Sequence, residues 1–277
     1  MTKKLKTMFV LATATMAAVS CGSKPEAQKV LVLYYSQTSN TKAVAQEIAT
    51  RLNADIEEIV PVTPYDGDFQ ATIQRCMMER EEEVVPEIQP VNADLSQYDV
   101  IFLGYPVWFG TFAPPVATFL KATNLSGKKI VPFCTFGSGG LESSMKDIVE
   151  LQPKADVLSG YGVRAARLDA APREIERFLI ASGFLEGEYT APADFPEQHN
   201  VNADETAIFT AAVGDYPMLH AEAKTVASRT TEDGEEYLFT AAGLPRDDRP
   251  DMPPAGELQV YVLVAPDTAP VFTRVVR

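Results

Sequence analysis

The sequence predicts an α/β protein, with a five-stranded, doubly wound parallel sheet followed by a small α+β domain with antiparallel strands. Between residues 30 and 183, five short apolar runs alternate with stretches of helical periodicity, and the connections are short. The runs at 31–35 and 100–104 are continuously apolar, which is typical of strands buried on both faces of a parallel sheet. After residue 203, one helical stretch precedes four β-favouring runs that are paired by turn signals.

The elements of the first domain follow from apolar periodicity and from the residues that interrupt it. Pro61 ends the second strand, and Pro114 and Pro115 suit the first turn of a helix, where a missing N–H costs little. Gly183 is typical of a residue that ends a helix. Strands are expected at 31–35, 56–60, 100–104, 129–135 and 157–163, and helices at 41–53, 71–83, from 114, at 141–151 and at 171–182.

The last third of the chain predicts a separate unit that carries no recognisable chemistry. Residues 187–202 contain two prolines and read as a linker between a first domain at 29–186 and a second at 203–277. A helix is expected at 203–213. The dipeptide Asp233-Gly234 is a strong hairpin signal. Strands are expected at 224–231, 235–241, 257–264 and 271–277.

The N-terminus resembles a bacterial lipoprotein signal. Three lysines among the first six residues precede an apolar run at 8–19, which is too short to span a bilayer, and small residues lead directly to Cys21. The resemblance implies a signal peptide at 1–20, lipidation of Cys21 and a tether at 21–28. A plain secretory signal with an incidental cysteine is the alternative. In both cases the mature chain is expected outside the cytoplasm. The lipoprotein interpretation places it in the cell envelope, with membrane contact through the lipid anchor only.

Charge and composition exclude several kinds of function. The net charge is −14, and loss of three lysines with the leader would bring it to −17, which disfavours nucleic acid as a partner. Cys76 and Cys134 fall in a helix and a strand and suggest neither a disulfide framework nor a metal site. His199 and His220 both lie in the last third, so the first domain can hold neither a Ser-His-Asp triad nor a histidine metal site.

The loop S-Q-T-S-N-T at 36–41 separates the first strand from the first helix. Its N–H groups and the positive end of the helix could both point at an anion. Its hydroxyl groups would add donors, and Asn40 tolerates the backbone angles of a tight loop. An ordinary turn capped by Asn40 or Thr41 explains the same residues equally well.

Two further unusual loops are expected at the same edge of the sheet. Residues 105–113 are dense in aromatics and include the only tryptophan, Trp108, and residues 135–140 read T-F-G-S-G-G. Because the carboxyl ends of parallel strands meet at one rim, the three loops are expected to wall one pocket. A phosphate cradle, a stacking aromatic and glycines that allow close backbone approach suit a flat, phosphorylated aromatic cofactor.

These motifs together resemble the flavodoxin family, over residues 29–183. The loop at 36–41 is similar to the FMN phosphate loop of that family, usually written [ST]-x-T-G-N-T. The resemblance implies FMN as cofactor, held at its phosphate by Ser36, Gln37, Thr38, Ser39, Asn40 and Thr41. It implies that the isoalloxazine lies along Pro106, Val107, Trp108, Phe109 and Gly110, with its other edge at Thr135, Phe136, Gly137, Ser138, Gly139 and Gly140.

Two departures from the family pattern stand out. Ser39 replaces the usual glycine and would cost about 1 kcal/mol if that position needs a positive φ. The second aromatic that stacks on the flavin is not defined by the pattern, because Phe109 and Phe136 are both candidates and each could equally belong to the core.

Three functions compete at this point. The first is an electron-transfer flavoprotein in which bound FMN carries the redox chemistry and exchanges electrons with a redox partner protein or quinone. The second is an FMN-dependent NAD(P)H:quinone-type oxidoreductase, although the sequence shows no dinucleotide fingerprint. The third is a flavin-free interaction module on a flavodoxin scaffold. No residue suggests a general acid or base for hydrolysis.

Overall fold

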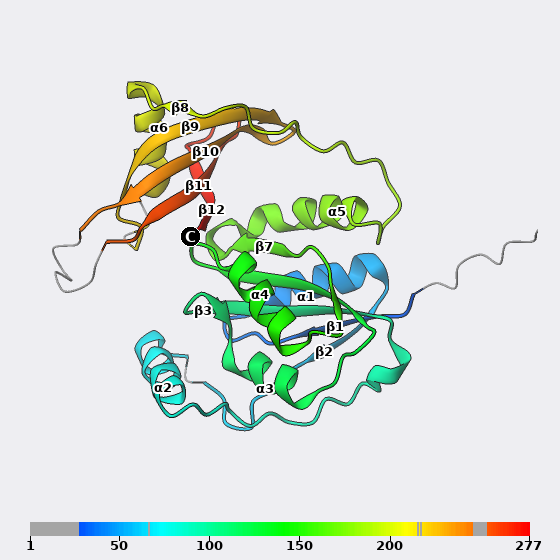
Figure 1. Cartoon of the computed structure of the whole chain (residues 1–277). Helices are drawn as coiled ribbons and strands as arrows, with labels where there is room; N and C mark the ends of the chain where they lie inside the picture. The colour runs from blue at the N-terminus through cyan, green and yellow to red at the C-terminus, as the bar shows by residue number, and fades with distance from the viewer. Residues whose placement is uncertain (1–27, 66, 215, 217, 246–253) are drawn as a thin grey trace, which may run out of the picture.

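The computed structural model describes residues 28–277 except 66, 215, 217 and 246–253 (Figure 1). The predicted leader, the lipidation site Cys21 and most of the tether therefore lie outside the described residues. Among the residues that are described, no helix is both long and apolar enough to cross a bilayer. The chain forms two sheets, one mainly parallel and one antiparallel, each with its own core.

The larger sheet has the strand order β2-β1-β3-β5-β6, with β7 also beside β5 and β4 beside β3. All its pairings are parallel except the short one between β3 and β4. The predicted doubly wound parallel architecture is confirmed. Its strands are β1 Val30–Tyr34, β2 Asp55–Glu58, β3 Val100–Trp108, β4 Thr111–Phe112, β5 Lys129–Phe136, β6 Asp156–Val157 and β7 Tyr161–Arg164.

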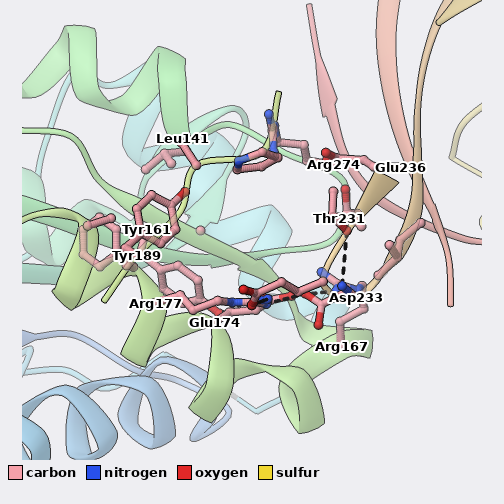
Figure 2. A pocket seen from close by; sticks show the side chains of 18 of the residues that line it. Leu141, Tyr161, Arg167, Glu174, Arg177, Tyr189, Thr231, Asp233, Glu236 and Arg274 are labelled. Atoms are coloured by element: carbon pink, nitrogen blue, oxygen red, sulfur yellow. Dashed lines mark hydrogen bonds and ion pairs between the residues drawn. The ribbon is translucent and has the colours of Figure 1, made fainter. Parts of the chain in front are cut away.

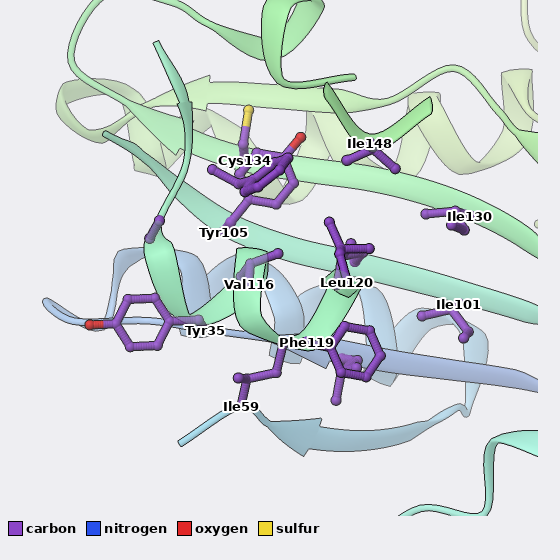
Figure 3. Packing of buried hydrophobic residues seen from close by; sticks show 14 of the residues in the cluster. Tyr35, Ile59, Ile101, Tyr105, Val116, Phe119, Leu120, Ile130, Cys134 and Ile148 are labelled. Atoms are coloured by element: carbon purple, nitrogen blue, oxygen red, sulfur yellow. The ribbon is translucent and has the colours of Figure 1, made fainter. Parts of the chain in front are cut away.

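Helices cover both faces of this sheet, which is why its central strands are continuously apolar. Val100 and Phe102 of β3 pack in one core with α1 and α5, whereas Ile101 and Leu103 pack in the other core with α3 and α4. Figure 3 shows the second core, where α3 side chains lie against β1 and β3. The helices are α1 Asn40–Leu52, α2 Phe69–Glu81, α3 Pro114–Ala122, α4 Leu141–Leu151 and α5 Ala171–Ala181, with short 3₁₀ helices at Leu95–Gln97 and Ala165–Ala170.

The prediction of one strand at 157–163 is wrong, because the structure has two short strands there, β6 and β7. The break lies beside Pro132 of β5, which has no N–H to donate to a neighbouring strand. Gly160 passes so close to β5 that a Cβ there would lie 2.6 Å from the Pro132 carbonyl oxygen. The proline and the close approach together interrupt the pairing at this point.

The predicted C-terminal helix and four antiparallel strands are confirmed, with one additional strand. The sheet has the order β12-β11-β10-β9-β8, and α6 packs on it around Phe209 and Phe239. The hairpin turn is formed by Glu232 and Asp233, and Gly234, whose φ is 135°, begins the next strand. The elements are β8 His199–Asn200, α6 Ala203–Val213, β9 Ala221–Thr231, β10 Gly234–Gly243, β11 Glu257–Val264 and β12 Val271–Val276. The first of these, β8, lies within the predicted linker.

The antiparallel sheet is docked against the carboxyl-end rim of the parallel sheet. The backbone N–H of Val275 in β12 donates to the Ser138 carbonyl oxygen at 2.6 Å. Arg177 of α5 forms an ion pair with Asp233 in the β9–β10 turn. Figure 1 shows β12 beside β7, in agreement with their contacts. Residues far apart in the sequence therefore meet at the rim that the sequence marks as functional.

Candidate functional site

The loop at 36–41 joins β1 to the N-terminus of α1. Ser39 has left-handed angles (φ 66°, ψ −3°), and its side chain does not cap the helix. Thr38 and Ser39 are exposed, and no acidic residue lies in the first turn of α1. Among the hydrogen bonds of the described residues, none is donated by the backbone N–H groups at 38–41. The predicted caps, Asn40 and Thr41, lie inside the helix. The loop therefore presents N–H donors at the positive end of α1.

The second segment differs from the predicted aromatic loop. Strand β3 continues through Trp108, turns at Phe109 and Gly110 with φ angles of 52° and 84°, and returns as β4. The prediction of a loop at 105–113 is therefore wrong. The sequence did not indicate this strand because Pro106 lies within the run, and a proline argues against the interior of a strand.

Trp108 is half-buried in an aromatic cluster that the sequence did not reveal. Its ring lies edge-on to Tyr35, with centroids 5.8 Å apart, and edge-on to Tyr65, with centroids 5.1 Å apart. The Tyr65 hydroxyl donates to Glu79 at 2.6 Å, and the Arg75 guanidinium lies over the Tyr65 ring. Burial, ahead of every other cause, raises the pKa of both tyrosines above the ordinary value, so both stay neutral.

The third segment begins inside β5, because Thr135 and Phe136 are the last residues of that strand. Phe136 is buried in the core, so it is not available to stack on a ligand at the rim. Phe109, in contrast, is half exposed and lies under the Arg80 guanidinium, 5.3 Å from it. Of the two predicted candidates for a second stacking aromatic, the structure leaves only Phe109.

Of the glycines that follow, Gly139 lies against the backbone of another element. Gly140 caps α4 with a φ of 116°. A Cβ on Gly139 would lie 2.1 Å from the Val275 carbonyl oxygen in β12, so this position must remain glycine for the C-terminal sheet to dock. The sequence suggested that these glycines approach a ligand. The structure shows that Gly139 approaches the second sheet.

All three segments contact one another in pairs. The Thr41 and Thr135 hydroxyl oxygens are hydrogen-bonded at 2.8 Å, which joins the first segment to the third. A Cβ on Gly140 would lie 2.6 Å from Cγ1 of Val107, which places the third segment beside the second. Tyr35, next to the first loop, touches Trp108 in the second. The convergence predicted from the switch-point rule is therefore present.

Helix α2 adds a wall that the sequence analysis missed. The Gln37 side-chain amide donates to the Thr72 hydroxyl at 2.8 Å, near the start of α2, whereas Arg80 at its other end covers Phe109. The helix therefore spans from the first loop to the β3–β4 turn. Irregular segments that contain prolines connect α2 to the strands on either side of it. Such segments have no periodicity, so the sequence did not indicate that α2 lies beside the other two segments.

The arrangement of donors and walls fits a phosphorylated planar ligand. Backbone N–H groups at a helix start suit a phosphate, and they require no charged side chain. Gly110 has no neighbouring atom within 4 Å of where a Cβ would be, so its surroundings are open. Within the described part of the chain, no cluster of three or more His, Cys, Asp or Glu side chains is gathered as a metal would need.

A large cavity of about 790 Å³ lies elsewhere, between α5, β7 and the antiparallel sheet (Figure 2). It contains none of the residues at 36–41 or 105–110. Its charged side chains are mostly engaged with one another, as in the ion pairs of Arg167 with Glu174 and of Arg177 with Asp233. The cavity separates the two sheets behind the third segment, and it is not the site that the three segments form.

Comparison with known proteins agrees with this fold. A family model described as flavodoxin matches residues 29–169, about half of the chain. The chain belongs to the flavodoxin family. Over 147 residues it is 29% identical to an NAD(P)H dehydrogenase (quinone) of Gluconacetobacter diazotrophicus, a match that covers 48% of this chain and 70% of that one.

Two solved structures each resemble about half of the chain. One, described as a flavoprotein from Bacteroides eggerthii, is 26% identical, and the match covers 56% of this chain and 97% of that one with a TM-score of 0.50. The other is a flavoprotein from Lactobacillus acidophilus in complex with FMN, 27% identical, with coverage of 49% and 93% and a TM-score of 0.44.

Replacing Ser39 by glycine is expected to stabilise the protein by about 0.5–1 kcal/mol, because serine pays for left-handed angles that glycine adopts freely. Asn53, at the other end of α1, also has left-handed angles (φ 47°) but is a residue that tolerates them. Asn53→Gly is therefore the matched control and should give the smaller gain. Urea unfolding measures both, and equal gains would show that Ser39 is not strained.

Proposed function

We propose that this protein binds FMN at the rim formed by the three segments and transfers electrons through it. The observation that carries the proposal is the start of α1, where the backbone N–H groups at 38–41 donate to no acceptor among the described residues and lie at the positive end of the helix. Two further segments meet beside it and provide an aromatic wall and a glycine-rich edge. The flavoprotein relatives support the same cofactor.

Each segment would have its own part in binding. The first would hold the phosphate through the backbone N–H groups and the polar side chains of Ser36, Gln37, Thr38, Ser39, Asn40 and Thr41. The second would line the isoalloxazine with Pro106, Val107, Trp108, Phe109 and Gly110, and the backbone of Thr135, Gly137, Ser138 and Gly140 would border its other edge. Phe136 and Gly139 are not assigned a direct contact, because one is buried in the core and the other faces β12.

Bound FMN would supply the redox chemistry, and this chain would bind it, orient it and keep water from it. The tyrosines beside Trp108 stay neutral, so they add no charge of their own to the ring wall. Anchoring by N–H groups would make affinity depend on the phosphate more than on the ring.

The test compares FMN with riboflavin on purified chain lacking the first twenty residues. We expect one FMN per chain, a yellow complex, and riboflavin binding at least a hundredfold weaker, since riboflavin has no phosphate for the loop. Isothermal titration calorimetry and absorbance measure both ligands. Equal affinity for the two flavins would contradict the assignment of the loop, and no binding of either would leave a flavin-free interaction module as the better function.

A second candidate is an FMN-dependent NAD(P)H:quinone oxidoreductase, supported by the relative of that name. Stopped-flow absorbance separates it from simple electron transfer. Reduction of bound FMN by NADH or NADPH within seconds, followed by reoxidation by a quinone, would favour the enzyme. Flavin that is reduced only by dithionite or by a redox protein would favour the electron-transfer protein.

We also propose that the mature protein is exported and held at a membrane of the cell envelope by lipid on Cys21. The basic residues, short apolar run and small residues before Cys21 support this proposal. Incorporation of a labelled fatty acid by the intact chain, and its loss in Cys21→Ser, tests it. Labelling that persists in Cys21→Ser would contradict it.

A further inference from the structure

Arg164, the last residue of β7, is a buried arginine without an acidic partner among the described residues. Its Nε donates to the Gly137 carbonyl oxygen at 2.8 Å, and its Nη1 donates to the Phe272 carbonyl oxygen at 2.9 Å. The guanidinium lies 3.4 Å from the centroid of the Phe272 ring. All these partners are neutral, so the positive charge is solvated by dipoles and a ring but is not neutralised.

The neighbouring arginines show that this arrangement is specific to Arg164. Arg167, three residues later, forms an ion pair with Glu174 at 2.7 Å, and Arg177 is paired with Asp233. Burial, ahead of any other cause, lowers the pKa of Arg164, and the charge of Arg167 acts in the same direction. A guanidinium remains protonated at neutral pH even so. A buried unpaired cation is costly, and the fold keeps one here.

The position of this charge relates it to the candidate site. Gly137 is the first residue after β5 and is exposed at the rim, in the segment that would border the isoalloxazine. The guanidinium binds the carbonyl of that same residue from the protein side. In the proposed binding mode, the peptide unit of Gly137 would lie between this fixed positive charge and the edge of the ring.

The C-terminal sheet completes the binding of this arginine. The Phe272 carbonyl and ring both belong to β12, and β12 is also hydrogen-bonded to the third segment through Val275 and Ser138. Without β12, the guanidinium would retain only the Gly137 carbonyl of these two acceptors and would lose its aromatic cover. The second sheet thus holds Arg164 in place at the back of the rim.

We propose that Arg164 is a charge-compensating residue that stabilises the anionic reduced form of bound FMN, and that the C-terminal sheet serves to fix it there. The inference rests on the proposed function and deepens it. The protein carries a large net negative charge, which by itself would disfavour a reduced, anionic flavin. A buried cation acts at short range in a low dielectric, where it is screened little, and so offsets that effect locally.

The test is the ratio of the affinities for oxidised and reduced FMN in Arg164→Met, Arg164→Lys and the wild type. We expect Arg164→Met to lose about tenfold in affinity for reduced FMN relative to oxidised FMN, which lowers the two-electron midpoint potential of the bound flavin by about 30 mV. Arg164→Lys keeps the charge and should stay within about twofold of the wild type. Spectroelectrochemical titration and calorimetry with oxidised FMN measure both quantities.

Arg167→Met is the matched control. It also removes one positive charge, three residues along the chain, but that charge is already paired with an acidic side chain. It should change the ratio by less than about threefold. If Arg164→Met weakens both forms of FMN equally, Arg164 is only structural and the proposal is overturned while FMN binding stands. A wild type that binds no FMN instead overturns the proposed function.

A measurement on the wild type alone keeps the proposal testable if Arg164→Met does not fold. The fixed charge should keep bound reduced FMN anionic down to a lower pH than free FMN. In a plot of midpoint potential against pH, the slope changes at the pH where the bound reduced FMN ionises. A break at the same pH as for free FMN, or at a higher one, overturns the proposal.

Discussion

Thr38→Asp is expected to weaken FMN binding by a hundredfold or more and to leave the fold intact. Thr38 is exposed in the loop that would hold the phosphate, so its side chain supports no core contact. A carboxylate there would lie within about 5 Å of the phosphate, and two like charges at that distance repel by about 3 kcal/mol at an effective dielectric constant of 20. Calorimetric titration with FMN measures the loss.

Thr38→Asn is the control for this prediction, because asparagine has nearly the same shape as aspartate and no charge. It should bind FMN within about fivefold of the wild type. Thermal unfolding of the three apo proteins should show that neither substitution unfolds the loop or α1. If Thr38→Asp bound FMN as tightly as Thr38→Asn, the phosphate would not lie at this loop.

Gly139→Ala is expected to separate the C-terminal sheet from the rim and to cost about 2–4 kcal/mol in the free energy of unfolding. The added Cβ would lie 2.1 Å from the Val275 carbonyl oxygen, and a backbone atom cannot move aside as a side chain can. Separation would also lose the hydrogen bond between Val275 and Ser138. Urea unfolding gives the cost, and faster proteolysis in the segment at 184–198 reports the separation.

Gly137→Ala is the control within the same segment. Its Cβ would meet the Tyr216 hydroxyl at 2.8 Å, at the far end of a side chain that can shift. We expect a cost below about 1 kcal/mol and no change in proteolysis. Similar costs for the two variants would mean that β12 does not hold the third segment closely.

The fold was predictable where one local rule decides the structure. The apolar runs of β1 and the first part of β3 lie between two helical layers, so no alternative to a buried strand exists for them. The hairpin between β9 and β10 and the helix α6 follow from equally local signals. The place where the three segments meet was predictable because parallel strands share one rim.

The parts that sequence reasoning missed depend on contacts between distant residues. Tyr65 reaches Trp108 from a connector without periodicity, and Gly139 approaches β12 across more than a hundred residues of chain. Arg164 could have been read as an ordinary surface residue, because only the folded chain shows that it lacks an acidic partner. In each case the deciding partner lies on another element, so no local pattern identifies it.

The most direct test of the account is the fluorescence of Trp108 during titration with FMN, since it is the only tryptophan of the chain. If the ring of FMN lies along the second segment, the flavin quenches the fluorescence of the nearby Trp108 indole by energy transfer. We predict that the tryptophan emission falls by more than about half and saturates at one FMN per chain, and that Thr38→Asp prevents the decrease over the same concentration range. Emission that stays constant while calorimetry reports bound FMN would place the flavin away from Trp108 and contradict the account.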